Sequence, residues 1–103
     1  MHAVIRSYTG ASKLIDEMER KRKDVEKEIS GVSGFRAYYA VRDGGTLTAV
    51  TICETKAGLK ESTQRAADWV KRNLPKVSIG APKVAEGEVF LRFEAKKQPV
   101  GKR

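Results

Sequence analysis

The tripeptide Asp43-Gly44-Gly45 constrains the fold of this chain most, because it separates two runs of strand-forming residues. Residues 35–42 (FRAYYAVR) and 46–54 (TLTAVTICE) are rich in aromatic and β-branched side chains. Asp-Gly followed by a second glycine between two such runs is a strong signal for a tight β-hairpin. We therefore predict two antiparallel, neighbouring strands in the middle of the chain.

A helix and a further strand are predicted on each side of this hairpin. Apolar residues recur at helical spacing over residues 12–30 and 56–74, and the second segment ends before Pro75. Residues 3–8 and 84–95 are predicted strands. The order β-α-β-β-α-β is that of the ferredoxin-like α+β fold. Right-handed crossovers then place both helices on one face of a four-stranded antiparallel sheet.

Length and charge fit one soluble domain. The chain has 103 residues, and we expect one domain over residues 1–95 followed by a basic, flexible tail at 96–103. The formal net charge of +8 is concentrated in residues 56–76 and in that tail. No apolar run approaches the roughly 20 residues of a membrane span, and residues 1–8 do not form a signal peptide. We therefore expect a cytoplasmic protein with no membrane partner.

Residues that carry chemistry are sparse. Cys53 is the only cysteine and His2 the only histidine, which excludes an internal disulfide and a cysteine-based zinc site and leaves little room for histidine-based general base catalysis. The glycines form neither the dinucleotide-binding nor the phosphate-loop pattern. We expect no metal and no cofactor, and the sequence assigns no catalytic residue.

Sorting the strand residues by a period of two divides the sheet into two faces. We predict that the more apolar set lies under the helices. The other set, which includes Val4, Arg6 and Tyr38, forms a bare face that is too apolar to remain in water. A second copy of the chain is the expected cover. The predicted helix-side set is Ala3, Ile5, Ser7, Phe35, Ala37, Tyr39, Val41, Leu47, Ala49, Thr51, Cys53, Val89, Leu91 and Phe93.

Three segments resemble the antibiotic-biosynthesis-monooxygenase-like (ABM-like) branch of the dimeric α+β barrel superfamily. They are AVIRSYTG, GVSGFRAYYAVRDGG running into TLTAVTICE, and STQRAADWVKRNLP, and together they span roughly residues 1–95. The resemblance implies a homodimer, with a pocket between helices and sheet in each protomer. It also implies pocket positions for a first-strand Asn, best matched by Ser7, and for a second-helix Trp, matched by Trp69. The lack of any histidine after His2 argues against haem degradation.

We therefore predict a pocket lined by Ser7, Tyr39, Thr51 and Trp69 that binds a small aromatic or apolar molecule. The resemblance adds a cofactor-independent monooxygenase as the activity of such a pocket. The competing interpretation is structural: Ser7 and Thr51 as hydroxyls satisfied within the fold, and the two aromatic residues as ordinary core.

A nucleic-acid-binding module is the alternative. The RNA-recognition motif has the same element order and binds RNA on its bare sheet face, and the basic helix at 56–74 and the basic tail suit that partner. Residues 46–54 lack the aromatic and glycine pattern that the motif requires on this strand, which disfavours the alternative. A small-molecule regulatory domain of similar topology is a third option.

Overall fold

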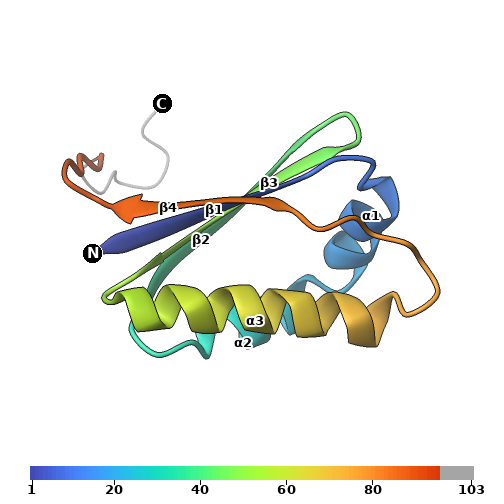
Figure 1. Ribbon diagram of the computed structural model, residues 1–103, viewed down its shortest axis with the longest axis horizontal. Coiled ribbons are helices and arrows are strands. Elements are labelled where there is room, and N and C mark those ends of the chain that lie inside the picture. The colour runs from blue at the N-terminus through green and yellow to red at the C-terminus, as the bar shows by residue number, and fades with distance from the viewer. Residues whose placement is uncertain (96–103) are drawn as a thin grey trace, which may run out of the picture.

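Strands and helices follow one another in the predicted order, with one helix divided in two. The computed structural model describes residues 1–95, so the predicted tail at 96–103 lies outside the described residues. The elements are β1 (His2–Tyr8), α1 (Ser12–Arg20), α2 (Arg22–Ser30), β2 (Phe35–Asp43), β3 (Thr46–Cys53), α3 (Lys56–Asn73) and β4 (Lys83–Glu88), as Figure 1 shows.

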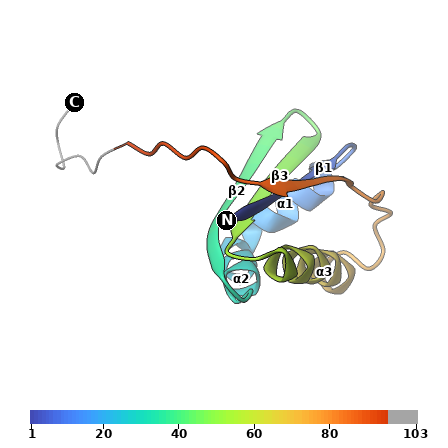
Figure 2. The ribbon, with the colours of Figure 1, turned by 60° about the vertical axis from the view of Figure 1, so that its left-hand side comes forward.

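The four strands form one antiparallel sheet in the order β2-β3-β1-β4. All three helices lie on the same face of this sheet (Figure 2), where α2 packs against β2, and α3 packs against β1 and β3. The predicted ferredoxin-like α+β architecture is confirmed. The opposite face, called the outer face below, is covered by no helix or strand of residues 1–95. None of the described helices is long and apolar enough to cross a membrane.

The predicted hairpin is confirmed. Asp43 pairs with Thr46, which leaves a two-residue loop of Gly44 and Gly45 between β2 and β3. Gly44 has a φ of 59°, a conformation that side chains with a Cβ rarely adopt. The hairpin is also tied to α1, because the Ala11 amide donates to the Gly45 carbonyl at 2.7 Å.

The single helix predicted over residues 12–30 is wrong in one respect, because it breaks at Lys21. This residue has φ −115° and ψ 36°, outside the helical range, although no glycine or proline is present there. Its side chain donates to Asn73 Oδ1 at 2.7 Å and pairs with Glu17 at 3.0 Å. A contact with α3 that local sequence does not reveal therefore accompanies the bend.

The last strand is shorter than the prediction of 84–95. It pairs with β1, and the final pair joins Glu88 to His2 at the start of that strand. The Val89 amide still donates to the Met1 carbonyl at 2.9 Å. Beyond that point the neighbouring strand has ended, so residues 89–95 have no ladder to continue.

The predicted side-chain direction is right for β3 and wrong for β1 and most of β2. Leu47, Ala49, Thr51 and Cys53 of β3 are buried under the helices as predicted. In β1 the buried residues are instead Val4, Arg6 and Tyr8, because both alternating sets of this strand contain apolar residues and apolarity does not decide between them.

In β2 a bulge reverses the alternation. The register shifts between Phe35 and Ala37, so that Tyr38 pairs with Thr51 on the helix side and Tyr39 pairs with Val50 on the outer face. Tyr39 is 61% exposed as a result. The residues on the outer face, as the register gives them, are Ala3, Ile5, Ser7, Ala37, Tyr39, Val41, Thr48, Val50, Ile52, Lys83, Ala85 and Gly87.

The core consists of two apolar clusters with a polar layer between them. One cluster is Val4, Val32, Cys53 and Leu59, and the other is Tyr8, Ala11, Leu14, Ile15, Leu47 and Trp69. Between these clusters each of three elements places one buried polar residue: Arg6 from β1, Thr51 from β3 and Ser62 from α3. Gly58 lets the first turn of α3 lie close to the segment between α2 and β2, because a Cβ at this position would lie 2.6 Å from the Ser33 carbonyl oxygen.

Candidate ligand pocket

The most unusual residue of the core is Arg6, whose side chain is 1% exposed. Its Nη2 donates to Thr51 Oγ1 at 2.9 Å, and its Nη1 lies 3.3 Å from both Ser62 Oγ and Thr63 Oγ1. Ser62 Oγ in turn donates to the Leu59 carbonyl at 2.7 Å, which fixes its lone pairs toward the arginine. The guanidinium is therefore held in one position by hydroxyl groups.

These hydroxyls carry no charge, and the cation remains without a counter-ion. Within residues 1–95 no carboxylate forms an ion pair with Arg6. Its Nε is fully buried and has no hydrogen-bond partner among the described atoms. Removing an ion from water costs several kcal/mol unless an opposite charge compensates. The burial of Arg6 is therefore unfavourable for folding in the ligand-free chain.

A small cavity lies beside this guanidinium, between the helices and the sheet. Its free volume is about 30 Å³, room for about two water molecules. Apart from Arg6, Glu28 and two tyrosine hydroxyls, its walls are apolar. The lining residues are Arg6, Tyr8, Leu14, Met18, Val25, Glu28, Ile29, Tyr38, Leu47, Ala49, Ala66, Trp69 and Val70.

A surface groove of about 190 Å³ adjoins this inner cavity and shares Met18, Val25 and Leu47 with it. It runs between α1, α2 and the end of β2. Its rim carries Arg42, which forms a two-pronged pair with Glu19 at 2.8 and 2.9 Å. Met18, which lines both spaces, is the shared residue whose unbranched side chain adapts its shape most easily.

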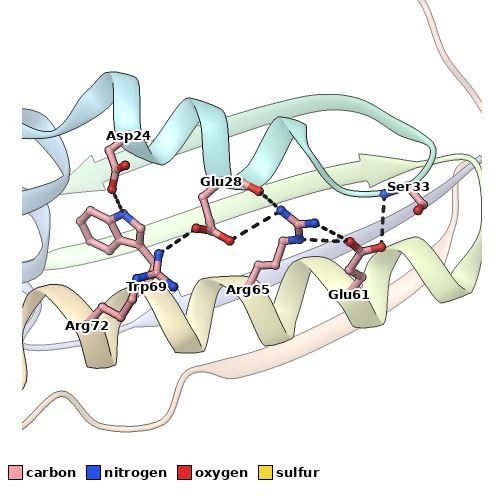
Figure 3. Close-up of polar contacts among 7 residues, drawn as sticks. All are labelled: Asp24, Glu28, Ser33, Glu61, Arg65, Trp69 and Arg72. Carbon is pink, nitrogen blue, oxygen red and sulfur yellow. Dashed lines mark hydrogen bonds and ion pairs between the residues drawn. The ribbon is translucent and has the colours of Figure 1, made fainter.

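The Trp69 wall of the cavity is fixed by polar contacts between α2 and α3 (Figure 3). The indole Nε1 donates to Asp24 Oδ2 at 2.8 Å. Further along the same two helices, Arg65 donates to the Glu28 carbonyl at 3.1 Å, and Arg72 donates to Glu28 Oε1 at 2.7 Å. The Glu28 carboxylate is thereby engaged by α3 and does not serve as the counter-ion of Arg6.

Two tyrosine hydroxyls of the cavity stay protonated at neutral pH. Burial raises the pKa of Tyr38 and of Tyr8 above the ordinary value, while the neighbouring Arg6 charge acts in the opposite direction. A protonated hydroxyl donates a hydrogen bond. The cavity therefore offers tyrosine O–H donors beside a cation, a combination suited to an anionic oxygen. Burial also raises the pKa of the Cys53 thiol, which argues against a reactive thiolate.

The predicted pocket residues do not meet in one place. Trp69 lines the cavity, and Thr51 binds Arg6 at its edge. Ser7 and Tyr39 were predicted on this same helix-side face, which is wrong: both lie on the outer face, because β1 and β2 have the opposite alternation. Arg6, Tyr8 and Tyr38 take their place. A buried arginine on a strand of mixed polarity leaves no signal in the sequence that would have separated it from a surface residue.

The residues do not fit haem. The only histidine, His2, lies at the start of β1 and contributes to a surface depression with Lys56 and Glu88, not to the inner cavity. Within residues 1–95, no group of three or more His, Cys, Asp or Glu side chains is arranged to hold a metal ion.

Solved structures share this fold at low sequence identity. MhuD, a haem-degrader from Mycobacterium tuberculosis, matches in its form with two manganese protoporphyrin IX molecules per active site, with a TM-score of 0.68 and 14% identity over 92% of this chain and 100% of that chain. A candidate antibiotic biosynthesis monooxygenase from Bordetella bronchiseptica matches with a TM-score of 0.66 and 15% identity over 87% and 97% of the two chains. A protein of unknown function from Nitrosomonas europaea matches with a TM-score of 0.66 and 17% identity over 97% and 95%.

Sequence comparison adds nothing to this likeness, since no family model and no curated protein matches the chain. Nothing in the comparisons supports the nucleic-acid-binding alternative. At these identities the likeness concerns the fold. The helices on one face, the strand order and the matches along nearly the whole chain agree, and the chain has the ferredoxin-like α+β fold of the ABM-like proteins.

Proposed function

We propose that this chain is a small-molecule-binding protein of the ABM-like type, which takes up an aromatic or apolar molecule between its helices and its sheet. The observation that carries the proposal is the apolar cavity beside Trp69, which shares three of its lining residues with an open groove. Pockets for small molecules are concave and mostly apolar, with a few polar groups that orient the ligand. Arg6 and the two tyrosines provide those groups here.

The ligand-binding state requires some side-chain movement. The free volume of about 30 Å³ inside the cavity is smaller than an aromatic ring needs, whereas the adjoining groove offers about 190 Å³. A shift of Met18, which lines both spaces, would join them. The body of a ligand would then lie in the groove and reach inward past Met18.

A homodimer is part of the proposal. The outer face exposes Ile5, Tyr39 and Val41 at 42%, 61% and 56%. Phe90 and Phe93, which follow β4 on a segment that runs away from the body of the protomer (Figure 2), are 85% and 89% exposed. Exposed apolar surfaces of this kind mark association sites. A second sheet of the same composition, packed face to face, would cover Ile5, Tyr39 and Val41.

Cofactor-independent monooxygenation is the activity to test on a bound ligand. With O₂ as the oxidant, an activated CH₂ group is oxidised to a carbonyl. One oxygen atom enters the product, and the other leaves as water with the two displaced hydrogens, so that no separate reductant is required. Candidate monooxygenases among the structural neighbours support this choice of reaction. Oxygen consumption with any ligand recovered from the purified protein would test it.

Trp69 gives a direct test of ligand binding, because it is the only tryptophan and contributes one indole N–H signal to a proton–nitrogen NMR spectrum. We expect neutral 2-naphthalenemethanol to move that signal in a saturable way. Ala66→Leu, which fills the cavity, should weaken binding at least tenfold. Its exposed neighbour provides the control, since Ala67→Leu should leave the affinity unchanged. Equal binding by the two variants, or none by the natural chain, would refute the proposed site.

A further inference from the structure

The charge of Arg6 carries an inference about the ligand itself. The side chain is 1% exposed, lines the inner cavity and has no carboxylate partner among the described residues. We infer that the occupant of this cavity carries a carboxylate, which pairs with Arg6 while the apolar remainder lies toward the groove. The inference rests on the proposed function, because it names the chemical class of the molecule that the cavity binds.

The free donors of Arg6 match a carboxylate. A guanidinium has five N–H groups, and three of them face the hydroxyls of Thr51, Ser62 and Thr63. Nε–H is one of the groups left over, and its nitrogen is buried without a partner. The two remaining donors match in number a carboxylate in a bidentate pair, and the Tyr8 hydroxyl also lies within reach of the guanidinium. The three hydroxyls have already oriented the guanidinium, so little freedom is lost when the anion arrives.

The positions of the two spaces indicate how such a molecule lies. Arg6 lines the inner cavity but not the groove, whereas Met18 and Val25 line both. The inner cavity, with room for about two water molecules, is of the size of a head group. The head therefore enters and replaces water beside Arg6. The groove, lined by Ile15, Val25 and Leu47 and by charged residues at its rim, takes the hydrocarbon or aromatic body.

Charge balance and acidity favour a carboxylate over a phosphate and over a phenol. Arg6 is the only lysine or arginine among the cavity-lining residues, and the nearby Glu28 is already paired with α3. One negative charge neutralises the site, whereas a doubly charged phosphate would leave an excess of negative charge in it. A carboxylic acid, with a pKa of about 4, is ionised at neutral pH, whereas a phenol, with a pKa of about 10, must first lose a proton.

The test compares two probes that differ in this charge, 2-naphthoate and 2-naphthamide, by calorimetry and by the Trp69 indole signal. For the natural chain we expect the carboxylate to bind at least tenfold more tightly than the amide. Arg6→Met should remove this preference, whereas Arg6→Lys should keep part of it, since the charge remains but the two-pronged geometry does not. Arg20→Met, at an exposed position on α1, is the matched control and should keep the full preference.

Thermal unfolding of the ligand-free proteins separates a ligand-binding role from a structural one. Replacing an uncompensated buried charge by an apolar side chain of similar size is neutral or stabilising. We therefore expect Arg6→Met to match or exceed the melting temperature of the natural chain. A large decrease, or a variant that does not fold, would show that the hydroxyl contacts of Arg6 also contribute to stability. The two probes are then compared on Arg6→Lys, where an undiminished preference for the carboxylate would overturn the inference.

The outcomes distinguish the two proposals. Equal affinity for carboxylate and amide would leave the cavity as a binding site and overturn the carboxylate assignment. Binding of neither probe, and none of neutral 2-naphthalenemethanol, would overturn the proposed function and the inference together. A preference for the carboxylate that survives in Arg6→Met would place the anion elsewhere and would also overturn the inference.

Discussion

The two faces of the sheet each contain residues that would suit the other face better. The helix-side face is closed to water, yet it holds Arg6 and a ring of hydroxyls. The outer face is open in the protomer, yet it carries Ile5, Tyr39 and Val41. A buried charge and an exposed apolar surface are both unfavourable. The comparison favours both proposals made above, an anion beside Arg6 on the inside and a second copy of the chain on the outside.

The outer face should give the largest effect when it is altered. Val50 lies in the middle of this face, paired with Ile5 on one side and Tyr39 on the other. We expect Val50→Lys to weaken the dimer at least a hundredfold, because it places a charge at the centre of an apolar interface. Sedimentation velocity over a micromolar range measures the change.

A lysine introduced on the helix layer provides the control for this effect. Ala57→Lys, at an exposed position of α3, should leave the association unchanged. A natural chain that is monomeric at these concentrations would contradict the dimer, and a Val50→Lys variant that remains dimeric would show that another surface holds the two copies together.

Two threonines of one strand sharpen the comparison between the faces. Thr51 of β3 accepts a 2.9 Å hydrogen bond from Arg6, whereas Thr48 of the same strand lies on the outer face. Thr51→Val should lower the free energy of unfolding by about 1.5–3 kcal/mol, as expected when a charged donor loses its acceptor. Thr48→Val should change it by less than about 0.5 kcal/mol. Urea denaturation measures both.

A double-mutant cycle then isolates the contact with Arg6. When Arg6 is already methionine, Thr51→Val should cost almost nothing, because the donor is absent. If Thr51→Val is equally costly in both backgrounds, the threonine hydroxyl serves some other purpose than holding the guanidinium.

The smallest expected effect concerns alkaline pH. Burial raises the pKa of the Tyr38 hydroxyl in the folded chain above its value in the unfolded chain, which is about 10. The neutral hydroxyl therefore contributes its full stability below about pH 10, and this contribution is lost as the pH rises through the folded-state pKa. Stability should decline more steeply above pH 10 in the natural chain than in Tyr38→Phe.

Tyr39→Phe is the matched control, because this neighbouring residue lies on the open face. The measurement belongs in the Val50→Lys background, where the outer face stays in contact with water. There, Tyr39→Phe measures how much of any change in slope comes from removing a tyrosine hydroxyl from the open face. Equal slopes for Tyr38→Phe and the parent would show that the Tyr38 hydroxyl is ionised as easily in the folded as in the unfolded chain.

Local signals predicted the elements well. The two glycines after Asp43 specified the hairpin, and the apolar spacing with Pro75 gave α3 almost to the residue. β3 has no bulge, so the alternation that its sequence predicts holds from Leu47 to Cys53. Turns and helices of this kind depend on interactions between residues a few positions apart, which the sequence alone reveals.

Relations between distant residues were not predictable in this way. The bend at Lys21 accompanies a contact with Asn73 on another helix, and the end of β4 depends on where β1 begins. For the same reason, only Trp69 of the predicted pocket residues lines the cavity, and Thr51 contacts Arg6 beside it. Trp69 could be predicted from its residue type and its place on a predicted helix. The hydroxyl groups that accept hydrogen bonds from Arg6 belong to β3 and α3, which are distant from β1 in the sequence.

The bulge in β2 gives this strand a place where its length can change without a change in the pocket. Between Phe35 and Ala37 one additional residue, Arg36, stands outside the ladder, so that Phe35 pairs with Cys53 and Ala37 pairs with the next residue of β3, Ile52. Deleting Arg36 would remove the bulge and leave both pairs as they are, with Tyr38 still on the helix side and Tyr39 still on the outer face. A one-codon deletion at this position is thus one that the lining of the cavity would not register, whereas a deletion nearer the hairpin would exchange the faces of the residues between it and the bulge.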